Sequence, residues 1–568
     1  MRQPKLNLTA QTRQTVQRFG GIERPPQLGR FEDLENLTSD ETPAAATRAP
    51  RQRIDLPEDT VGCAVAAKEK LAYVLGSVFI AQGASVWYDG QKVAGLRLTR
   101  GDKQLVGMGA YLCIFPDKKY FNTVKPTDCG SMEAVLLGEN VTLCPCDAEG
   151  TPRTYLPANN TPTEGSLRIA DGALQRYDGT TWVATPAYVR LTCDARGAGF
   201  RAGDTVAVSD VQNDLLAGDH LVVKATSQHL ILEGLFEEER FVSNVTVTRA
   251  VPDMDFVVQC RNRLWGCRYD ALQGKNEIYC CALGDFFNWS RFAGTASDAW
   301  RASCGSDGPF TGAAVYGGCP LFFKEQCVHR VHISASGAHQ LTETPCQGVQ
   351  RGSGASLAQV GGLLYYHSCQ GVMAYDGATA RCVSQALGQC RFRSAIAGGF
   401  DGKYYLAVTD SPAARHPFSG GTQRWTLLVY DTERDLWHRE SCTRPKGFAA
   451  LRDALYLLCD EALYLLCGAQ AANEGAFAWY CESGPIAWQQ PERKYVSRLT
   501  LRLELSDWAD LYVRYDDKPF THIAHLRAGS RLVPLHPRRC DSFALRLEGV
   551  GRMRLSSASW VLERGSDR

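Results

Sequence analysis

From about residue 61 onward, short apolar runs alternate with turns rich in glycine and aspartate, and one unit of this pattern recurs along the chain. The unit is an apolar run, a turn, a short aliphatic or aromatic segment, a second turn, and an aromatic residue followed by Asp-Gly or a similar turn. Copies span 70–93, 256–289, 356–383 and 394–440, and a weaker copy spans 447–468. Short strands joined by tight turns form antiparallel meanders. Each copy therefore predicts three or four antiparallel strands.

A small meander with apolar residues on both faces must stack on a neighbour to bury them. Meanders stacked radially form a β-propeller, and a repeat of about 40 to 50 residues is typical of four-stranded blades. The recurring aromatic residues are then predicted to pack between blades; they are Tyr88, Tyr375, Tyr430 and Trp437. The aspartates that follow the tyrosines are predicted to cap turns; they are Asp89, Asp376 and Asp431.

Residues 1–60 show no sustained periodicity and contain several prolines, which predicts an extended N-terminal arm. Its apolar anchors Phe19, Ile22 and Phe31 are expected to bury themselves against a neighbouring copy in an assembly. A disordered tail is the alternative. The arm ends on basic residues that either face DNA, face an acidic neighbour or lie in solvent; they are Arg48, Arg51 and Arg53.

The remaining changes in pattern divide the chain further. We assign 61–117 to the first propeller blades and 118–250 to an inserted, barrel-like β domain, in which β-branched runs alternate with turns. Residues 251–490 are assigned to the remaining blades. From 491 to 568 apolar and polar residues alternate strictly, which predicts a C-terminal β-sandwich with one solvated face per sheet. The predicted fold class is all-β.

Composition narrows the class of protein. At 568 residues the chain is long enough for several cores, and 62 Lys and Arg against 61 Asp and Glu leave a formal net charge of +1. This balance argues against a protein that coats nucleic acid or a membrane surface. The chain contains no apolar run long enough to cross a membrane, and its first residues lack the apolar core of a signal peptide. A soluble protein made in a cytosol is expected.

The 22 cysteines are expected to be reduced thiols packed in the core, because several lie inside apolar strand-like runs. Cys144 and Cys146, in CPCD, resemble half of a metal site, but no second pair follows at zinc spacing and histidine is scarce, so a turn is expected there. His329 and His332 are predicted to face opposite sides of one strand, which disfavours metal binding by both together. No metal or cofactor is predicted.

Motifs for common catalytic sites are missing from the sequence: there is no GxSxG, HExxH, phosphate-binding glycine loop or dinucleotide fingerprint. A pair of glycosidase carboxylates cannot be told from the turn aspartates by sequence. We expect a structural or binding protein without enzymatic activity.

Three stretches resemble a family of tailed-bacteriophage and prophage structural proteins. They are FGGI…FEDLENLTSDETPAAATRAPRQR near the start, PDMDFVVQCRNRLWGCRY…NEIYCCALGDFFNW in the middle, and LHPRRCDSFALRLEGVGRMRLSSASWVLERGSD at the end. The arm, propeller and sandwich are more broadly similar to tail-hub, nozzle or packaged-DNA stabilisation proteins of short-tailed phages.

The resemblance implies a virion tail protein, assembled in the cytoplasm of the bacterial host, that forms a homo-oligomeric ring around the channel used for DNA ejection. Its implied partners are copies of itself, other tail or head-tail connector proteins, and channel DNA contacted without sequence specificity. No membrane partner is implied.

Two other functions remain open at the level of sequence. A carbohydrate- or receptor-binding propeller of a phage tail tip would be favoured if tryptophans such as Trp289, Trp437 and Trp479 lined a pocket. A propeller glycoside hydrolase is the third possibility.

Overall fold

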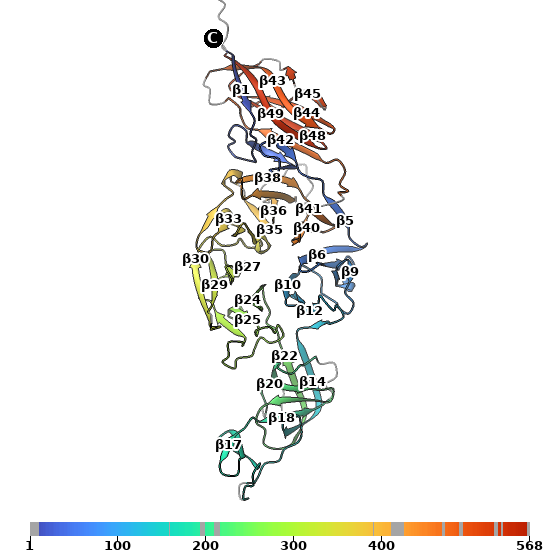
Figure 1. Cartoon of the computed structure of the whole chain (residues 1–568), viewed down its shortest axis with the longest axis vertical. Helices are drawn as coiled ribbons and strands as arrows, with labels where there is room; N and C mark the ends of the chain where they lie inside the picture. Colours follow the sequence, from blue (N-terminus) through green and yellow to red (C-terminus); the bar gives the residue numbers. More distant parts are fainter. Residues whose placement is uncertain are drawn as a thin grey trace, which may run out of the picture.

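The computed structural model describes residues 11–157, 160–193, 199–209, 216–334, 336–389, 391–410, 425–468, 472–487, 492–527, 532–534 and 538–564. Throughout these residues the chain forms β-strands, turns and short 3-10 segments, with no α-helix. The all-β prediction is confirmed. Three bodies follow one another along the longest axis of the molecule: a sandwich at the top of Figure 1, a ring of small sheets in the middle, and a barrel at the bottom.

The ring consists of seven four-stranded antiparallel sheets formed by the described residues. The first four sheets are β6 (Thr60–Ala67), β7 (Leu71–Ser77), β8 (Ala84–Tyr88) and β9 (Gln91–Lys92); β10 (Gln104–Met108), β11 (Tyr111–Phe115), β12 (Lys119–Asn122) and β13 (Cys129–Ser131); β23 (Phe256–Cys260), β24 (Arg263–Asp270), β25 (Lys275–Cys280) and β26 (Trp300–Ser303); and β27 (Gly312–Tyr316), β28 (Cys319–Phe323), β29 (Cys327–Ile333) and β30 (His339–Pro345). The last three are β31 (Ala358–Val360), β32 (Leu363–Ser368), β33 (Gly371–Tyr375) and β34 (Ala380–Cys382); β35 (Phe392–Phe400), β36 (Lys403–Asp410), β37 (Trp425–Asp431) and β38 (Leu436–Ser441); and β39 (Pro445–Leu451), β40 (Ala454–Cys459) and β41 (Ala462–Cys467) with β5 (Gln52–Asp55).

The first strands of successive sheets lie next to one another and close a circle. β6 lies beside β10, β10 beside β23, β23 beside β27, β31 beside β35, β35 beside β39, and β39 beside β6 again. The 3-10 segment η3 (Gly354–Ser356) contacts β27 on the step to β31. This is the strand arrangement of a β-propeller. The last sheet takes its outer strand, β5, from the N-terminal part of the chain, where Gln52 pairs with Leu465.

The turns between the first two strands of a sheet explain why the repeat folds locally. Arg261 and Asn262 both have positive φ between β23 and β24, as do Asp401 and Gly402 between β35 and β36. Two successive residues in this conformation make the tight hairpin turn whose twist matches that of the strands. Asparagine, aspartate and glycine adopt it at low cost, which is why they punctuate the repeat.

The barrel is an insertion between the second and third sheets of the ring. Its strands are β14 (Ala134–Cys146), β18 (Tyr188–Thr192), β19 (Thr205–Ser209), β20 (Gly218–Ala225), β21 (His229–Glu233) and β22 (Arg240–Arg249), and a small sheet of β15 (Leu167–Ala170), β16 (Ala173–Tyr177) and β17 (Trp182–Ala184) extends from it. The predicted start of the insertion at 118 is wrong, because β12 and β13 complete the second sheet of the ring. Phe121 on β12 pairs with Leu112 and is buried there.

The sandwich pairs both ends of the chain. One sheet joins β1 (Gln11–Val16), β3 (Leu37–Thr38), β4 (Ala45–Thr47), β43 (Lys494–Leu505), β46 (Leu532–Pro534), β47 (Arg539–Cys540) and β49 (Met553–Arg564); the other joins β2 (Phe31–Glu35), β42 (Ala478–Ser483), β44 (Trp508–Tyr515), β45 (Thr521–Arg527) and β48 (Phe543–Val550). Along β43, Leu499, Leu501 and Leu503 are buried between the sheets while Arg502 and Glu504 are exposed. The predicted boundary at 491 is wrong, because β42 already belongs to the sandwich.

The extended arm predicted for 1–60 is also wrong over its described part. Five short strands lie in it, and four of them pair with strands more than 400 residues away. A segment whose partners lie so far along the chain shows no periodicity of its own, because each strand is too short to display one. The arm therefore belongs to the fold of its own chain.

Candidate functional site: the arm clamp and the ring interfaces

The apolar anchors of the arm are buried within their own chain. The rings of Phe19 and Phe31 are stacked, with centroids 6.2 Å apart, and both belong to a core that includes Leu34 and Trp437. The backbone N–H of Ile22 donates a hydrogen bond to the carbonyl of Trp437 at 2.8 Å. The prediction that these anchors bury themselves against a neighbouring copy is therefore wrong: each is already covered by the ring and the sandwich.

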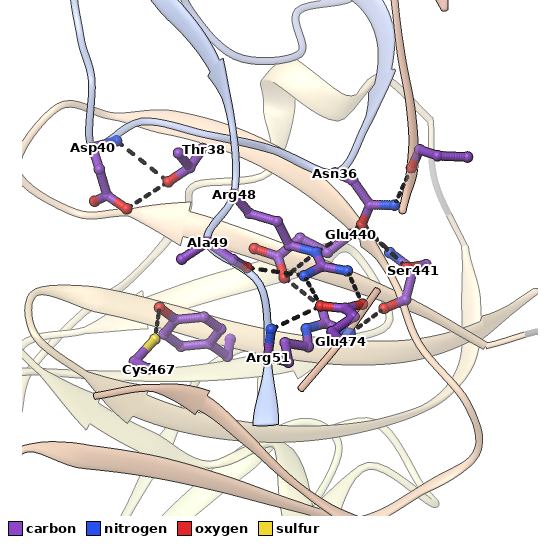
Figure 2. Close-up of polar contacts among 12 residues, drawn as sticks. Asn36, Thr38, Asp40, Arg48, Ala49, Arg51, Glu440, Ser441, Cys467 and Glu474 are labelled. Atoms are coloured by element: carbon purple, nitrogen blue, oxygen red, sulfur yellow. Dashed lines mark hydrogen bonds and ion pairs between the residues drawn. The ribbon is translucent and has the colours of Figure 1, made fainter. Parts of the chain in front are cut away.

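Two of the three basic residues at the end of the arm are buried in ion pairs (Figure 2). Arg48 holds the carboxylate of Glu474 with two parallel hydrogen bonds of 2.7 Å each and lies over the ring of Phe477 at 4.0 Å. Arg51 pairs with Glu440, and its backbone N–H donates to Glu474 at 2.7 Å. The arm clamp, as we call Asn36, Arg48, Arg51, Glu440 and Glu474, joins arm, ring and sandwich.

Electrostatics in the arm clamp favour the charged forms. Burial opposes the charge of Arg51, but the adjacent Glu440 carboxylate outweighs it and raises the pKa of the guanidinium. Burial would likewise raise the pKa of Glu474, but hydrogen bonds from Arg48 and from the Arg51 backbone hold that pKa below its usual value. Two guanidinium groups buried against carboxylates are not free to bind DNA. Only Arg53 stays at the surface, 2.9 Å from Asp55.

Asn36 is the residue of the arm clamp that contacts the most elements (Figure 2). Its side-chain oxygen accepts hydrogen bonds from Arg48 at 3.0 Å and from the backbone N–H of Ser441 at 3.0 Å. Its side-chain nitrogen donates to the carbonyl of Ala478 at 2.8 Å. Its φ of 62° is in the left-handed region, which asparagine tolerates better than most residues. A signal for this residue exists in the sequence, the asparagine of ENLTSD, but only its partners reveal its role.

The recurring aromatic residues contact neighbouring sheets of the ring. Tyr88 lies edge-on to Phe121 of the second sheet, with centroids 5.6 Å apart, and Tyr375 lies 6.0 Å from Tyr316 of the sheet before it. Such pairs add to the stabilisation that comes from buried area.

The sixth sheet also makes an aromatic contact with the sheet before it. Tyr430 lies 5.9 Å from Tyr365 of the fifth sheet. Trp437 stacks on Tyr430 at 4.8 Å and donates its indole N–H to the carbonyl of Val383 at 2.8 Å. The four residues therefore lie where sheets of the ring meet.

The aspartates of the repeat lie at turns. Asp376 accepts hydrogen bonds from the backbone N–H groups of Ala378 and Thr379 at 2.8 and 2.7 Å, and these bonds hold its pKa below the usual value. Asp89 has a φ of 52° and pairs with Lys70. Asp376 therefore caps its own turn, whereas the contact described for the Asp89 carboxylate is the ion pair with Lys70.

The third aspartate is linked to the arm. Asp431 accepts a hydrogen bond from the hydroxyl of Ser39 at 2.5 Å and one from Arg434 at 2.9 Å. The side chain is buried, and although burial alone would raise its pKa, these bonds hold the pKa below the usual value.

The tryptophans that would support glycan binding do not line a pocket. Trp289, Trp437 and Trp479 are all buried in the core. Large cavities lie elsewhere. A polar cleft of about 840 Å³ beside the first two sheets of the ring is lined by Glu58, Asp59, Phe79, Lys92, Arg97 and Lys119, among others. A cavity of about 830 Å³ between the sheets of the sandwich is lined mainly by apolar residues such as Phe31, Leu501, Leu511, Leu547 and Trp560.

All 21 cysteines of the described residues are free thiols; Cys390 lies outside the described residues. Cys144 and Cys146 are buried in the barrel, and burial raises the pKa of Cys146 to about 11. Within the described part of the chain, one group of three residues has ligand atoms close enough together to hold a metal ion: Cys327, His329 and Glu343. His329 is buried and His332 exposed, on opposite faces of β29.

Comparisons with known proteins leave the family open. No family model matches the chain, and no curated protein matches it. Solved structures with partial similarity include PorZ of the type-IX secretion system of Porphyromonas gingivalis (10% identity, TM-score 0.25, 89% of this chain and 77% of that one). They also include BBS1N in complex with ARL6DN (11%, 0.30, 76% and 100%) and the endosialidase of phage phi92 (9%, 0.26, 89% and 80%).

The neighbours thus include a phage protein, but at this similarity the fold rests on the strand pairing described above and function is not transferred. No helix in the described residues has the length and hydropathy needed to cross a bilayer.

Proposed function

We propose that this chain is a structural protein of a tailed-bacteriophage virion, a tail hub or nozzle subunit that assembles as a ring of copies around the DNA-exit channel. The proposal is supported by the way the arm joins two bodies of the molecule. The arm completes both sheets of the sandwich and then supplies β5 to the ring, so that two bodies are tied by one segment. A rigid rod of closed β-modules suits a part that bears load during DNA ejection.

Copies of the chain must then meet through surfaces other than the arm anchors. The barrel offers one on the β14–β22 ribbon, where Leu137 is 74% exposed and Phe241 is 65% exposed. Val135 is also exposed there. Exposed apolar side chains gathered on one ribbon favour a protein contact.

The test is assembly. We expect the purified full chain to form rings by negative-stain electron microscopy and an antibody against it to label the tails of virions. Leu137→Asp should abolish the rings while leaving the monomer folded. Leu272→Asp is the matched control, since Leu272 is 99% exposed on a turn of the ring. A chain that stays monomeric at high concentration and is missing from virions would overturn the proposal.

No catalytic role is proposed for the turn aspartates, since Asp376 and Asp431 accept hydrogen bonds from the backbone of their own turns. A carbohydrate-binding role is a second candidate, located at the polar cleft beside the first two sheets. The half-exposed ring of Phe79 beside charged groups such as Arg97 favours it, because sugars bind to aromatic faces flanked by polar groups. Polysaccharide binding that is lost in Phe79→Ala, with ring assembly intact, would support this candidate. Binding that is unchanged in that variant would reject it.

A further inference from the structure

The fourth sheet of the ring gathers three side chains with different ligand atoms. Cys327 and His329 are two residues apart on β29, and residues with this spacing point to the same face of a strand. Glu343 on β30 is the direct cross-strand partner of His329 in the antiparallel register. The hairpin therefore places a thiol, an imidazole and a carboxylate on one patch of one face.

The geometry of this group approaches that of a metal site. The ligand atoms of the three residues all lie within 4.8 Å of one another, and Nε2 of His329 is 3.2 Å from the nearer oxygen of Glu343. In a tetrahedral zinc site with bonds of about 2.0 to 2.3 Å, ligand atoms are about 3.3 to 3.8 Å apart. Small side-chain rotations that move the three ligand atoms by about 1 Å bring them to that separation.

A fourth oxygen is already present. The hydroxyl of Ser306, in the segment that follows the third sheet, lies 3.0 Å from Nε2 of His329 and 3.6 Å from the sulfur of Cys327. His329 is 1% exposed, whereas the side chain of Glu343 is 38% exposed. An ion can therefore enter past Glu343 and reach two buried donors.

We propose that Cys327, His329 and Glu343 bind a zinc ion on the fourth sheet of the ring, with a water molecule or the Ser306 hydroxyl as the fourth ligand. Thiolate, imidazole and carboxylate are the donors that zinc prefers. Zinc binds cysteine as the thiolate. The Cys327 proton leaves as the zinc–sulfur bond forms, and one proton is released for each ion bound.

A buried lysine near the proposed site affects its affinity for a metal ion. Lys324 is buried, donates hydrogen bonds to Asn276 at 2.9 Å and to the Ser306 carbonyl at 2.6 Å, and lies 4.8 Å from the ring centroid of Phe310. Its ammonium repels a metal ion, which weakens binding.

The experiment uses tag-free full-length protein, titrated with Zn²⁺ and with Co²⁺ as the spectroscopic probe. We expect one tightly bound ion per chain by elemental analysis and a cobalt–thiolate charge-transfer band in the near ultraviolet. Cys327→Ser should abolish the band, and Glu343→Gln should lower the affinity for Zn²⁺ at least ten-fold. Lys324→Met should raise the affinity.

Controls separate this site from the other thiols. His332→Gln changes the exposed histidine on the same strand, and Cys319→Ser removes a neighbouring thiol outside the group; both should leave the titration unchanged. If Cys327→Ser fails to fold, Glu343→Gln still decides, because its side chain is partly exposed and it tolerates the change. Equal Zn²⁺ affinity in Glu343→Gln, or a cobalt spectrum without the thiolate band, would overturn the proposal.

Discussion

The sandwich and the barrel lie on opposite sides of the ring and are attached to it in different ways (Figure 1). The sandwich shares one continuous core with the arm and with the fifth and sixth sheets of the ring. The barrel has a core of its own, made of residues between 136 and 247. The sandwich is therefore part of the folding unit of the ring, whereas the barrel is a separate unit set into it.

The polar contacts at the two junctions differ in the same way. In the arm clamp, Arg48 and Glu474 are 426 positions apart in the sequence. At the barrel junction Arg249 pairs with Asp204, 45 positions away, and donates to the carbonyl of Met132 at 3.1 Å. The barrel junction is made by residues inside or directly beside the insertion. The sandwich, by contrast, forms only when both ends of the chain come together.

The largest expected effect comes from deleting one body at a time. Deletion of residues 1–55 removes β5 from the ring and four strands from the sandwich, so we expect loss of soluble, folded protein. Replacement of 135–248 by a short glycine-serine linker should leave the ring and the sandwich folded, because Ala134 and Arg249 are direct strand partners. Circular dichroism and size-exclusion chromatography measure both. If the chain lacking residues 1–55 still folded, the conclusion that the sandwich and the ring form one folding unit would be wrong.

Removal of one buried arginine at each junction tests whether the effects stay local. Arg249→Met leaves the buried carboxylate of Asp204 without its main partner and should lower the free energy of unfolding of its region by about 3 to 5 kcal/mol. Arg48→Met should cost less, because the carboxylate of Glu474 is 27% exposed and keeps the hydrogen bond from the Arg51 backbone. Hydrogen exchange should rise along the arm and β42 in Arg48→Met and only in the barrel in Arg249→Met.

The surface arginine of the arm is the control for these variants. Arg53→Ala breaks an exposed ion pair and should leave the free energy of unfolding nearly unchanged. A larger loss would mean that Arg53 has a contact beyond Asp55.

The aromatic contacts between sheets test the ring itself. Tyr375→Ala removes a buried ring and should cost about 3 to 5 kcal/mol of unfolding free energy. Tyr375→Phe removes only the hydroxyl that donates to the Gly377 carbonyl at 3.0 Å, and it should cost about 1 kcal/mol. Denaturation in urea measures both, and equal effects would contradict a role in packing.

Acid should destabilise the region where the arm covers the ring. His438 is buried beneath the arm, where it lines a small cavity with Phe19 and Leu37, and burial lowers its pKa to about 4. The unfolded state takes up the proton near the ordinary histidine pKa of about 6.5, so stability is complete above that pH and is lost as the pH falls toward 4. The loss is on the order of 3 kcal/mol.

Thermal unfolding between pH 7 and pH 4.5 measures this dependence. The pKa of His367 in the fifth sheet is also lowered by burial to about 4 and adds a slope of the same sign. His438→Gln should therefore remove only part of the slope. An unchanged slope in His438→Gln would show that the arm region does not titrate.

The smallest effect is expected at the turns. Asp376→Asn weakens one cap and should lower the unfolding midpoint only slightly, without loss of any binding or assembly. Asp431→Asn should cost more, because it also disturbs the contact with Ser39 of the arm. Loss of polysaccharide binding or turnover in a stable Asp376→Asn variant would instead indicate a functional carboxylate.

Some features of the fold could be predicted from the sequence and others could not. The inserted barrel and the alternating strands of the sandwich were visible in the sequence, since period-two patterning and turn residues act over a few positions. The three proposed zinc ligands were not grouped by the sequence pattern, which drew attention to His329 and His332 instead. Cys327 and His329 share a strand, but Glu343 joins them only through the register of the hairpin, which no spacing rule supplies.

By itself the sequence determined the all-β class, the positions of most strands and turns, and the alternation that buries Leu499 and Leu501. These features depend on local backbone preferences and on the side-chain period of a strand. The tertiary structure alone decided that the arm completes two bodies and that Arg48 and Arg51 are buried. The reason is physical: a short strand or a single charge is stable only against its partner, and those partners lie 389 or more positions away in the sequence.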